Sequence, residues 1–215
     1  MVAIKLVTVG AAAVGKTAYI NRISGRSFCS SYMCTIGIDF YKDKRTFRNW
    51  GFALTTPFAK ARGVAPETPL SVLTWDTAGQ ERFHSISKTY FKGIDGGFLF
   101  FDLTCRESFD SLDKWMADMK EANPQAKDLP MVVVGNKRDL RAERVISTAE
   151  AMEYASKRDL LYFETSAKTC ANIWASYKAL IYLVLHSESF IEKSKREPST
   201  IIHPLRKTKS GGCTC

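Results

Sequence analysis

One glycine-bounded segment, Gly10 to Thr17, constrains the fold of this chain more than any other. It reads Gly-Ala-Ala-Ala-Val-Gly-Lys-Thr and matches the pattern G-x-x-x-x-G-K-[ST]. Residues 2–9 (VAIKLVTV) before it predict a strand, and the residues that follow Thr17 predict the start of a helix. In that setting, the backbone N–H groups of the loop and of the helix N-terminus form a concave site for phosphate. A strand-to-helix turn without a ligand is the alternative interpretation.

The polar end of this loop indicates what the site binds. Lys16 is expected to reach the β- and γ-phosphates of a nucleotide, and the hydroxyl of Thr17 is expected to ligate Mg²⁺.

A second motif, Asn136-Lys137-Arg138-Asp139, indicates which base is bound. It follows residues 131–135 (MVVVG), an apolar run typical of a strand that is buried on both faces. A carboxylate at the carboxyl end of such a strand can accept two hydrogen bonds from the N1–H and the exocyclic amine of guanine, an edge that adenine does not present. Asn, Lys and Asp are also common in turns, so this motif gains its weight from the phosphate loop.

Composition is consistent with one soluble domain. The chain has 215 residues, of which 45% are hydrophobic and 25% charged, and no run approaches the ~20 apolar residues of a membrane span. Residues 1–9 lead directly into a strand, so no signal peptide is visible, and six scattered cysteines favour a reducing cytosol. The net charge of +9 points weakly to anionic partners. Because no basic stripe alternates with aromatic residues, nucleic acid is not an expected partner.

Strands and helices are expected to alternate, which predicts an α/β fold with a mostly parallel sheet covered by helices on both faces. The strands expected over residues 40–47 and 70–75 are expected to pair antiparallel. Ser147 and Glu150 form a capping-box pattern at a helix start. The expected strands are 2–9, 40–47, 70–75, 97–102, 131–135 and 160–164, and the expected helices begin at 17 and span 108–122, 147–157 and 172–191.

Two further segments carry polar residues at strand ends. In residues 75–83 (WDTAGQERF), Asp76 can hold Mg²⁺ through a water, the N–H of Gly79 can approach a γ-phosphate, and Gln80 can orient an attacking water. In residues 164–168 (ETSAK), a backbone amide can meet guanine O6. Either segment alone is also compatible with an ordinary strand-to-loop junction.

Taken in this order, the motifs closely resemble the Ras superfamily of small GTPases and, within it, the Rab branch. The Rab-like segments are residues 36–40 (IGIDF), 75–83 (WDTAGQERF) and 90–93 (YFKG), and the resemblance covers residues 3–185 and the last three. It implies a single P-loop GTPase domain over residues 1–192, with a six-stranded sheet, and a flexible tail with a lipidation signal over residues 193–215.

The resemblance also implies a set of site residues. Gln80 would be catalytic. Phe28 would pack against guanine, although Phe28 and Trp75 are also compatible with an interior position. Tyr32 would cover the phosphates, and Thr35 would cap Mg²⁺ and the γ-phosphate. Metal ligands would be Thr17, Thr35 and Asp76; the effector surface would be Ile36, Gly37, Ile38, Asp39, Phe40, Trp75 and Tyr90; the remaining nucleotide-binding residues would be Ala13, Val14, Gly15, Lys16, Thr17, Ala18, Gly79, Asn136, Lys137, Asp139, Ser166, Ala167 and Lys168.

The implied function is a GTP/GDP-switched regulator of vesicle trafficking that recruits effectors to membranes. Loss of the γ-phosphate would release two loops, residues 30–37 and 79–87. The implied partners are an exchange factor, a GTPase-activating protein, effectors, a GDP dissociation inhibitor and the prenylation machinery. The implied location is the cytoplasmic face of endomembranes, in exchange with the cytosol.

Three features depart from the family pattern. Ala11, Ala12 and Ala13 stand where relatives more often carry polar or glycine residues, and any positive φ at Ala13 would be costly, so we expect somewhat weakened partner-stimulated turnover. Residues 49–69 exceed what a hairpin needs. They are expected to be either a tolerated surface insertion or a partner-binding loop beside the switch regions, with exposed aromatic residues at Trp50, Phe52 and Phe58.

The third departure is the end of the chain. A C-a-a-X ending is absent, and Cys213 and Cys215 resemble the Rab signal for two geranylgeranyl groups. Arg206, Lys207 and Lys209 would add a modest attraction to anionic headgroups. The missing C-a-a-X also disfavours a Ras or Rho identity.

Two other functions remain open from the sequence. A catalytically weak GTP-binding scaffold would keep the pocket without turnover; Gln80 argues against it, and the three alanines argue mildly for it. A P-loop ATPase or nucleotide kinase would prefer ATP, against which Asp139 and residues 166–168 argue.

Overall fold

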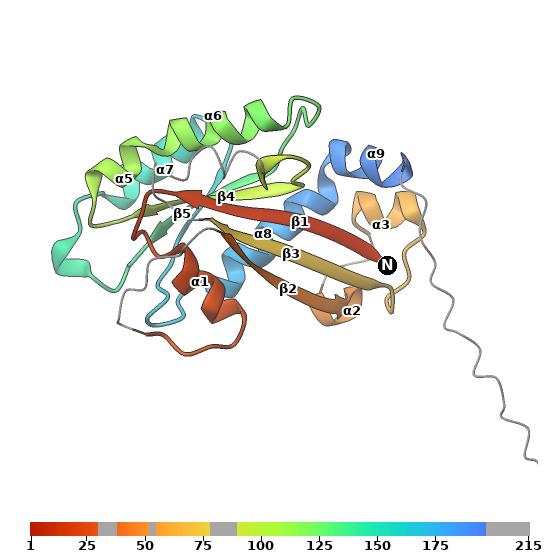
Figure 1. Ribbon diagram of the computed structural model, residues 1–215, viewed down its shortest axis with the longest axis horizontal. Helices are drawn as coiled ribbons and strands as arrows, with labels where there is room; N and C mark the ends of the chain where they lie inside the picture. Colours follow the sequence, from red (N-terminus) through yellow and green to blue (C-terminus); the bar gives the residue numbers. More distant parts are fainter. Residues whose placement is uncertain (30–37, 52–54, 78–89, 197–215) are drawn as a thin grey trace, which may run out of the picture.

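The computed structural model describes residues 1–29, 38–51, 55–77 and 90–196 (Figure 1). Their strands form one six-stranded sheet of order β2-β3-β1-β4-β5-β6, in which only β2 and β3 pair antiparallel. This confirms the expected mostly parallel α/β architecture. The strands are β1 Val2–Gly10, β2 Ile38–Thr46, β3 Pro69–Thr77, β4 Gly96–Asp102, β5 Met131–Asn136 and β6 Leu161–Glu164.

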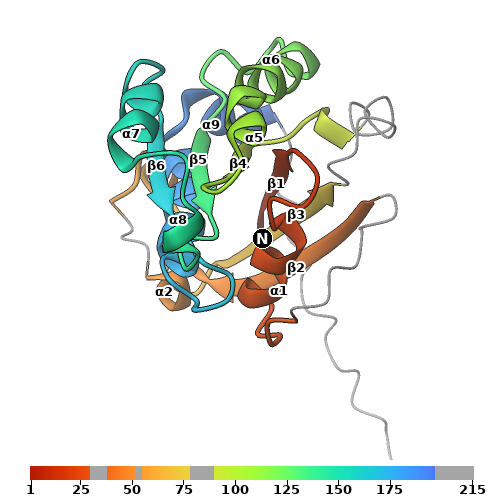
Figure 2. The same cartoon turned by 90° about the vertical axis from the view of Figure 1, so that its left-hand side faces the viewer.

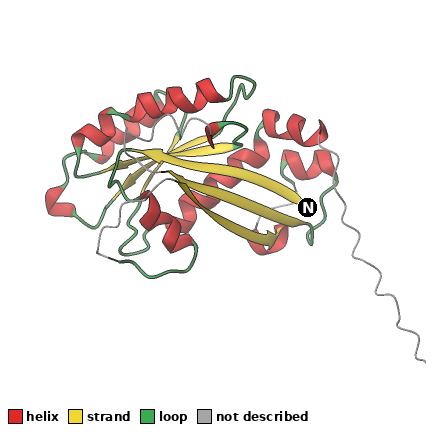
Figure 3. Cartoon of the chain, in the orientation of Figure 1, coloured by secondary structure: helices red, strands yellow, loops and turns green. Residues whose placement is uncertain are grey.

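Helices cover both faces of the sheet (Figures 2 and 3). Successive residues of a strand point to opposite faces, so Leu6 joins the core beneath one layer and Val7 the core beneath the other. The first layer contains α1 Lys16–Ile23, α2 Phe47–Trp50, α3 Pro57–Arg62, α8 Ile173–His186 and α9 Glu188–Arg196, and the second contains α5 Arg106–Asp110, α6 Leu112–Ala122 and α7 Thr148–Ser156. None of the helices in the described ranges is long and apolar enough to cross a membrane.

The carboxyl ends of the parallel strands meet at one edge of the sheet. Gly10 at the end of β1 pairs with Phe100 of β4, Asp102 of β4 pairs with Asn136 of β5, and Asp76 of β3 lies beside β1. The segments that follow these strands therefore converge, as expected for a ligand site in an open parallel sheet.

Two expected helices are interrupted. The helix expected over 108–122 begins at Arg106 and divides at Ser111, whose hydroxyl donates a hydrogen bond back to the carbonyl of Ser108 at 2.9 Å. The helix expected over 172–191 ends at His186, because Ser187 has an extended backbone (φ −71°, ψ 129°). At the start of α7, the Ser147 cap is confirmed: its hydroxyl accepts from the backbone N–H of Glu150 at 3.1 Å.

The helix α9 then begins after Ser187 and is capped from a distant loop. The carboxylate of Asp128 accepts hydrogen bonds from the backbone N–H groups of Glu188 and Ser189, at 2.8 and 3.2 Å. Residues 193–196, which the sequence analysis assigned to the tail, lie in the last turn of α9.

The extra residues between β2 and β3 form two short helices, and two of their aromatic side chains are buried, contrary to expectation. Trp50 and Phe58 are each only 1% exposed. Trp50 packs on Tyr177 of α8 with 6.0 Å between ring centroids, and Phe58 packs on Phe190 of α9 at 5.1 Å. Their partners come from the last quarter of the chain, so a local pattern does not reveal the burial. Phe52 lies outside the described residues.

The insertion also lies away from the place expected for it. The β2–β3 hairpin ends at the Thr46–Pro69 pair, next to Val2 at the start of β1. The phosphate loop follows the opposite end of β1, so the insertion is at the far end of the sheet from the expected site (Figure 1). The expected position beside the switch regions is therefore wrong for the described part of the insertion, because Ile38 and Thr77, which border those regions in the sequence, lie at the opposite end of the hairpin. Binding of a partner by the insertion stays a prediction.

We predict that Phe58→Ala lowers the free energy of unfolding by about 3–5 kcal/mol, because it removes a fully buried ring between two helices. Urea unfolding followed by circular dichroism measures the change. Lys60→Gln, at an exposed position of the same helix, should shift it by less than about 0.5 kcal/mol. Equal midpoints for Phe58→Ala and the wild type would show that the insertion is not part of the core.

Candidate functional site

The loop between β1 and α1 requires glycine at both ends. Gly10 has φ +142°, and a Cβ there would lie 2.2 Å from the carbonyl oxygen of Phe100. Gly15 has φ +95°, and its Cβ would lie 2.3 Å from Nδ2 of Asn136. These close approaches pack the loop against β4 and β5 and leave no room for a side chain.

Lys16 holds the loop in a curved conformation. Its Nζ donates hydrogen bonds to the carbonyl oxygens of Gly10 and Ala11, each at 2.8 Å, and the residue is only 5% exposed. The backbone carbonyls therefore hold the ammonium group at the centre of the loop. A phosphate bound in the loop would meet this charge directly.

Ala13 has a positive φ of 61°, the conformation that the sequence analysis considered costly for alanine. A non-glycine residue there carries backbone strain of roughly 1–2 kcal/mol. Val14 beside it is buried and packs in the first core. The loop thus combines a strained residue with a firmly packed neighbour.

Asp76 and Thr17 form the part of the expected metal site that the structure describes. Asp76 is 2% exposed, and burial raises its pKa, while a hydrogen bond with Thr17 and the charge of Lys16 act in the opposite direction. Its Oδ1 is buried and makes no hydrogen bond within the described part of the chain. A hollow of about 40 Å³ adjoins both residues. An unpaired carboxylate oxygen next to a hydroxyl fits a hard divalent cation such as Mg²⁺.

Asn136 connects the loop after β5 to the phosphate loop. Its Nδ2 donates to the carbonyl of Val14 at 2.9 Å, and its Oδ1 accepts from the hydroxyl of Thr165 at 3.1 Å. Lys137 next to it has φ 64°, and its Nζ forms an ion pair with Asp102 at 2.6 Å. Three segments that are distant in the sequence are thereby held together.

Asp139 lies beside the segment after β6, as expected. Its Oδ1 accepts a hydrogen bond from the hydroxyl of Ser166 at 2.5 Å. Ser166 and Ala167 are buried, and Lys168 is exposed. The structure thus brings the two expected base-reading segments together, and their role in binding stays a prediction.

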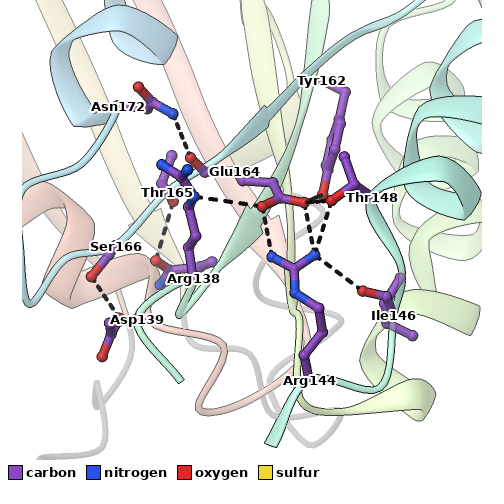
Figure 4. A network of polar contacts seen from close by, with 11 residues as sticks. Arg138, Asp139, Arg144, Ile146, Thr148, Tyr162, Glu164, Thr165, Ser166 and Asn172 are labelled. Carbon is purple, nitrogen blue, oxygen red and sulfur yellow. Dashed lines mark hydrogen bonds and ion pairs between the residues drawn. The ribbon is translucent and has the colours of Figure 1, made fainter. Parts of the chain in front are cut away.

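A charged network that the sequence analysis did not identify supports both segments (Figure 4). The guanidinium of Arg144 donates to both carboxylate oxygens of Glu164, at 2.8 and 2.6 Å, and Thr148 and Tyr162 donate to the same group. Arg138 lies 3.7 Å from it. These contacts, with the hydrogen bonds from Arg144 first, hold the pKa of Glu164 at about 2. No short-range pattern links residues this far apart.

Three aromatic residues of the expected effector surface lie in a row. The ring centroid of Trp75 is 5.6 Å from that of Phe40 and 5.2 Å from that of Tyr90. Phe40 is 57% exposed, and Trp75 is half-buried at the margin of the second core. Phe28 is 38% exposed, so it is not an interior residue. Asp39 is exposed next to Phe40.

Of the other expected site residues, Ala18 lies in α1. Tyr32, Thr35, Ile36, Gly37, Gly79, Gln80, Cys213 and Cys215 lie outside the described residues, as does the side chain of Ile38.

Comparison with known proteins agrees with this geometry. The Ras family matches residues 5–186 of the chain. The chain belongs to the Ras family. Similar relatives are Rab proteins: Rab-27B of Rattus norvegicus is 36% identical over 92% of this chain and 87% of its own length. Rab-3 of Caenorhabditis elegans is 32% identical over 98% and 90%, and Rab-2B of Dictyostelium discoideum is 31% identical over 92% and 85%.

Ras-family membership supports GTP hydrolysis in general, and binding of GTP or GDP with Mg²⁺. The described residues suit this chemistry. Lys16 places a cation in the loop after β1, Thr17 and Asp76 offer oxygen atoms that a cation could use as ligands, and Asp139 offers a carboxylate acceptor beside the hydroxyl of Ser166.

We predict that Glu164→Gln lowers the free energy of unfolding by about 1–3 kcal/mol at pH 7, because it weakens charge-assisted hydrogen bonds to Arg144. The pKa of Glu164 is lower in the folded protein than its ordinary value of 4.5. Its ionised form therefore stabilises the fold above that value, and this contribution disappears as the pH falls towards 2. Urea unfolding between pH 3 and 7 measures the difference between wild type and variant.

Glu153→Gln is the matched control, because Glu153 pairs with Lys157 on an exposed helix face. It should change stability by less than about 1 kcal/mol at any pH. A difference between wild type and Glu164→Gln that stays constant from pH 7 to pH 3 would contradict the assigned ionisation.

Proposed function

We propose that this chain is a Rab-type small GTPase that alternates between GTP- and GDP-bound states and recruits effectors to membranes in vesicle trafficking. The observation that carries the proposal is the hydrogen bond from Ser166 to Asp139, which joins the two segments expected to read the base, while Asn136 joins the first of them to the loop after β1. The Rab relatives and the row formed by Phe40, Trp75 and Tyr90 support the Rab assignment.

The chain's own residues act mainly by position and charge. Lys16 and the N–H groups of the loop bind the β- and γ-phosphates, and Asp139 accepts from the guanine edge. Thr17, Asp76 and Thr35 would hold Mg²⁺, which when bound supplies positive charge to the phosphates. Gln80 orients the attacking water. We expect slow intrinsic hydrolysis, on the order of 10⁻⁴ per second, which an arginine from a GTPase-activating partner raises about 10⁵-fold.

Partners would recognise the GTP-bound state through the two switch loops, residues 30–37 and 79–87. The proposed partners are an exchange factor, a GTPase-activating protein, effectors, a GDP dissociation inhibitor and the prenylation machinery. Two lipids on Cys213 and Cys215 would attach the protein to the cytoplasmic face of endomembranes, in exchange with the cytosol.

A second candidate function is a GTP-binding scaffold with weak catalysis. The positive φ of Ala13 favours it, because a strained alanine with a Cβ lies in the loop that must accommodate the transition state. Phosphate release in the presence of an activating partner separates the two: the switch releases phosphate, and the scaffold retains GTP.

We predict that Asp139→Asn reduces the preference for GTP over ATP by at least about a hundredfold, because the amide cannot accept both hydrogen bonds of guanine. Calorimetric titration with each nucleotide measures the preference. Asp159→Asn makes the same chemical change at an exposed turn and should leave it unaltered. An unchanged preference in Asp139→Asn, or equal affinity of the wild type for both nucleotides, would remove the proposal.

The membrane part of the proposal has a separate test. We predict that Cys213→Ser/Cys215→Ser moves a tagged chain from the membrane fraction of cells to the cytosolic fraction, while GTP binding is kept. Cys105→Ser is the control, because Cys105 belongs to the folded domain. Mass spectrometry that finds Cys213 and Cys215 of membrane-bound wild type unmodified would contradict lipidation.

A further inference from the structure

Three consecutive side chains of the segment after β5 are held by contacts with other strands. The Nζ of Lys137 forms an ion pair with Asp102 at the end of β4, at 2.6 Å. The Nε of Arg138 lies 3.7 Å from a carboxylate oxygen of Glu164, at the end of β6. Asp139 follows directly and accepts a hydrogen bond from the segment after β6, at 2.5 Å. The conformation of residues 137–139 therefore depends on both strands that flank β5.

Arg138 is joined to the end of β6 at two points. Its backbone N–H donates to the carbonyl of Thr165 at 3.0 Å, and its side chain pairs with the preceding residue, Glu164. A single hydrogen bond permits rotation about its own axis, and a second contact beside it restricts that rotation. The two contacts together therefore limit the movement of Asp139, the next residue. Lys137, on the other side, has a positive φ of 64°, a conformation that surrounding contacts must maintain.

The carboxylate of Glu164 offers Arg138 a fixed anchor (Figure 4). Its Oε1 accepts hydrogen bonds from Arg144, Thr148 and Tyr162, at 2.8, 2.7 and 3.1 Å, and its Oε2 accepts from Arg144 at 2.6 Å. Because these bonds, those from Arg144 first, hold the pKa of Glu164 at about 2, the group is ionised at neutral pH. Its side chain is only 12% exposed, so solvent screens the charge incompletely.

The pair between Arg138 and Glu164 is expected to act locally. The side chain of Arg138 is 44% exposed, and ion pairs of exposed side chains contribute little to the overall stability of a fold. In the segment, however, Arg138 lies between Lys137 and Asp139, two residues that are expected to meet the base. Loss of the pair should therefore loosen the segment and leave the fold intact.

We propose that Arg138 is a positioning residue of the nucleotide site: through Glu164 it holds Asp139 in the orientation that guanine requires, and it thereby slows the release of guanine nucleotides. The inference rests on the proposed function for the identity of the ligand. It goes beyond that function because, among residues 136–139, Arg138 is the one to which the family resemblance assigns no role.

The rate of GDP release tests the proposal. The full-length chain is loaded with GDP that carries a fluorescent group on its ribose, and release is followed after addition of excess unlabelled GDP and Mg²⁺. Arg138→Gln keeps the backbone hydrogen bond and removes the ion pair. We expect it to release GDP about twofold to fivefold faster than the wild type, which is the range that a partly exposed ion pair accounts for. An unchanged rate would overturn the proposal.

Arg141→Gln is the matched control. It removes the same charge from an exposed position three residues further along, in the short helix η2 Arg141–Glu143. It should release GDP at the wild-type rate. Equal acceleration in Arg138→Gln and Arg141→Gln would overturn the proposal, because it would show a general effect of positive charge on the phosphates. Circular dichroism and the nucleotide content confirm that each variant is folded and loaded.

Glu164→Gln shows whether Arg138 acts through Glu164. In the Glu164→Gln background, Arg138→Gln should give no further acceleration, because the anchor of the ion pair is already lost. Effects of the two substitutions that multiply would overturn the assigned route.

A change of base separates the positioning of Asp139 from a general loosening of the loop. Inosine diphosphate lacks the exocyclic amine, one of the two donors that Asp139 is proposed to meet. The factor by which Arg138→Gln speeds release should therefore be smaller for inosine diphosphate with the same fluorescent group than for GDP, and an equal factor would overturn the proposal. A wild type that binds GDP no more tightly than ATP would contradict the proposed function instead, whereas unchanged release from Arg138→Gln contradicts this inference alone.

Discussion

The nucleotide end of the molecule depends on one buried amide, that of Asn136. Its Nδ2 donates to the carbonyl of Val14, and its Oδ1 accepts from the hydroxyl of Thr165. One side chain therefore connects the loops that follow β1, β5 and β6. If any of them shifted, a buried polar atom would lose its partner, at a cost of about 1–3 kcal/mol. The glycine at position 15 belongs to the same constraint, because Nδ2 of Asn136 occupies the space that a Cβ would need.

Two charge pairs extend this constraint on both sides of the segment that follows β5. Lys137 is held by Asp102 at the end of β4, and Glu164 at the end of β6 is held by Arg144. The first pair joins the ends of the neighbouring strands β4 and β5, and the second joins the end of β6 to the segment between β5 and α7. The site is therefore assembled by tertiary contacts among rigid elements, and each motif alone supplies only part of it.

Sequence reasoning succeeded where the determining contacts are local. Apolar residues in the strands either alternate with polar ones or follow one another, and the spacing of two glycines marks the phosphate loop. Ser147 caps a helix through the backbone N–H of Glu150, three residues later. It failed where the contacting residues are distant in the sequence. Trp50 and Phe58 were expected to be exposed, but they pack against Tyr177 and Phe190, which no local pattern connects with them. One local signal was overlooked, since Thr56 before Pro57, with Gly63 afterwards, is the pattern of a short capped helix. The pairing of Arg144 with Glu164 had no local signal.

The position of Arg45 has a mechanical consequence. Its guanidinium lies 5.2 Å from the ring of Trp50 and 4.9 Å from that of Trp174, and it forms an ion pair with Asp43 at 3.0 Å. One end of β2 is thus clamped between the insertion and α8, while Phe40 at its other end stays exposed. The two ends of β2 are connected by its unbroken pairing with β3, from Ile38 opposite Thr77 to Thr46 opposite Pro69. A displacement at the nucleotide end of the hairpin would therefore have to travel along this ladder to an end that the insertion and α8 hold in place.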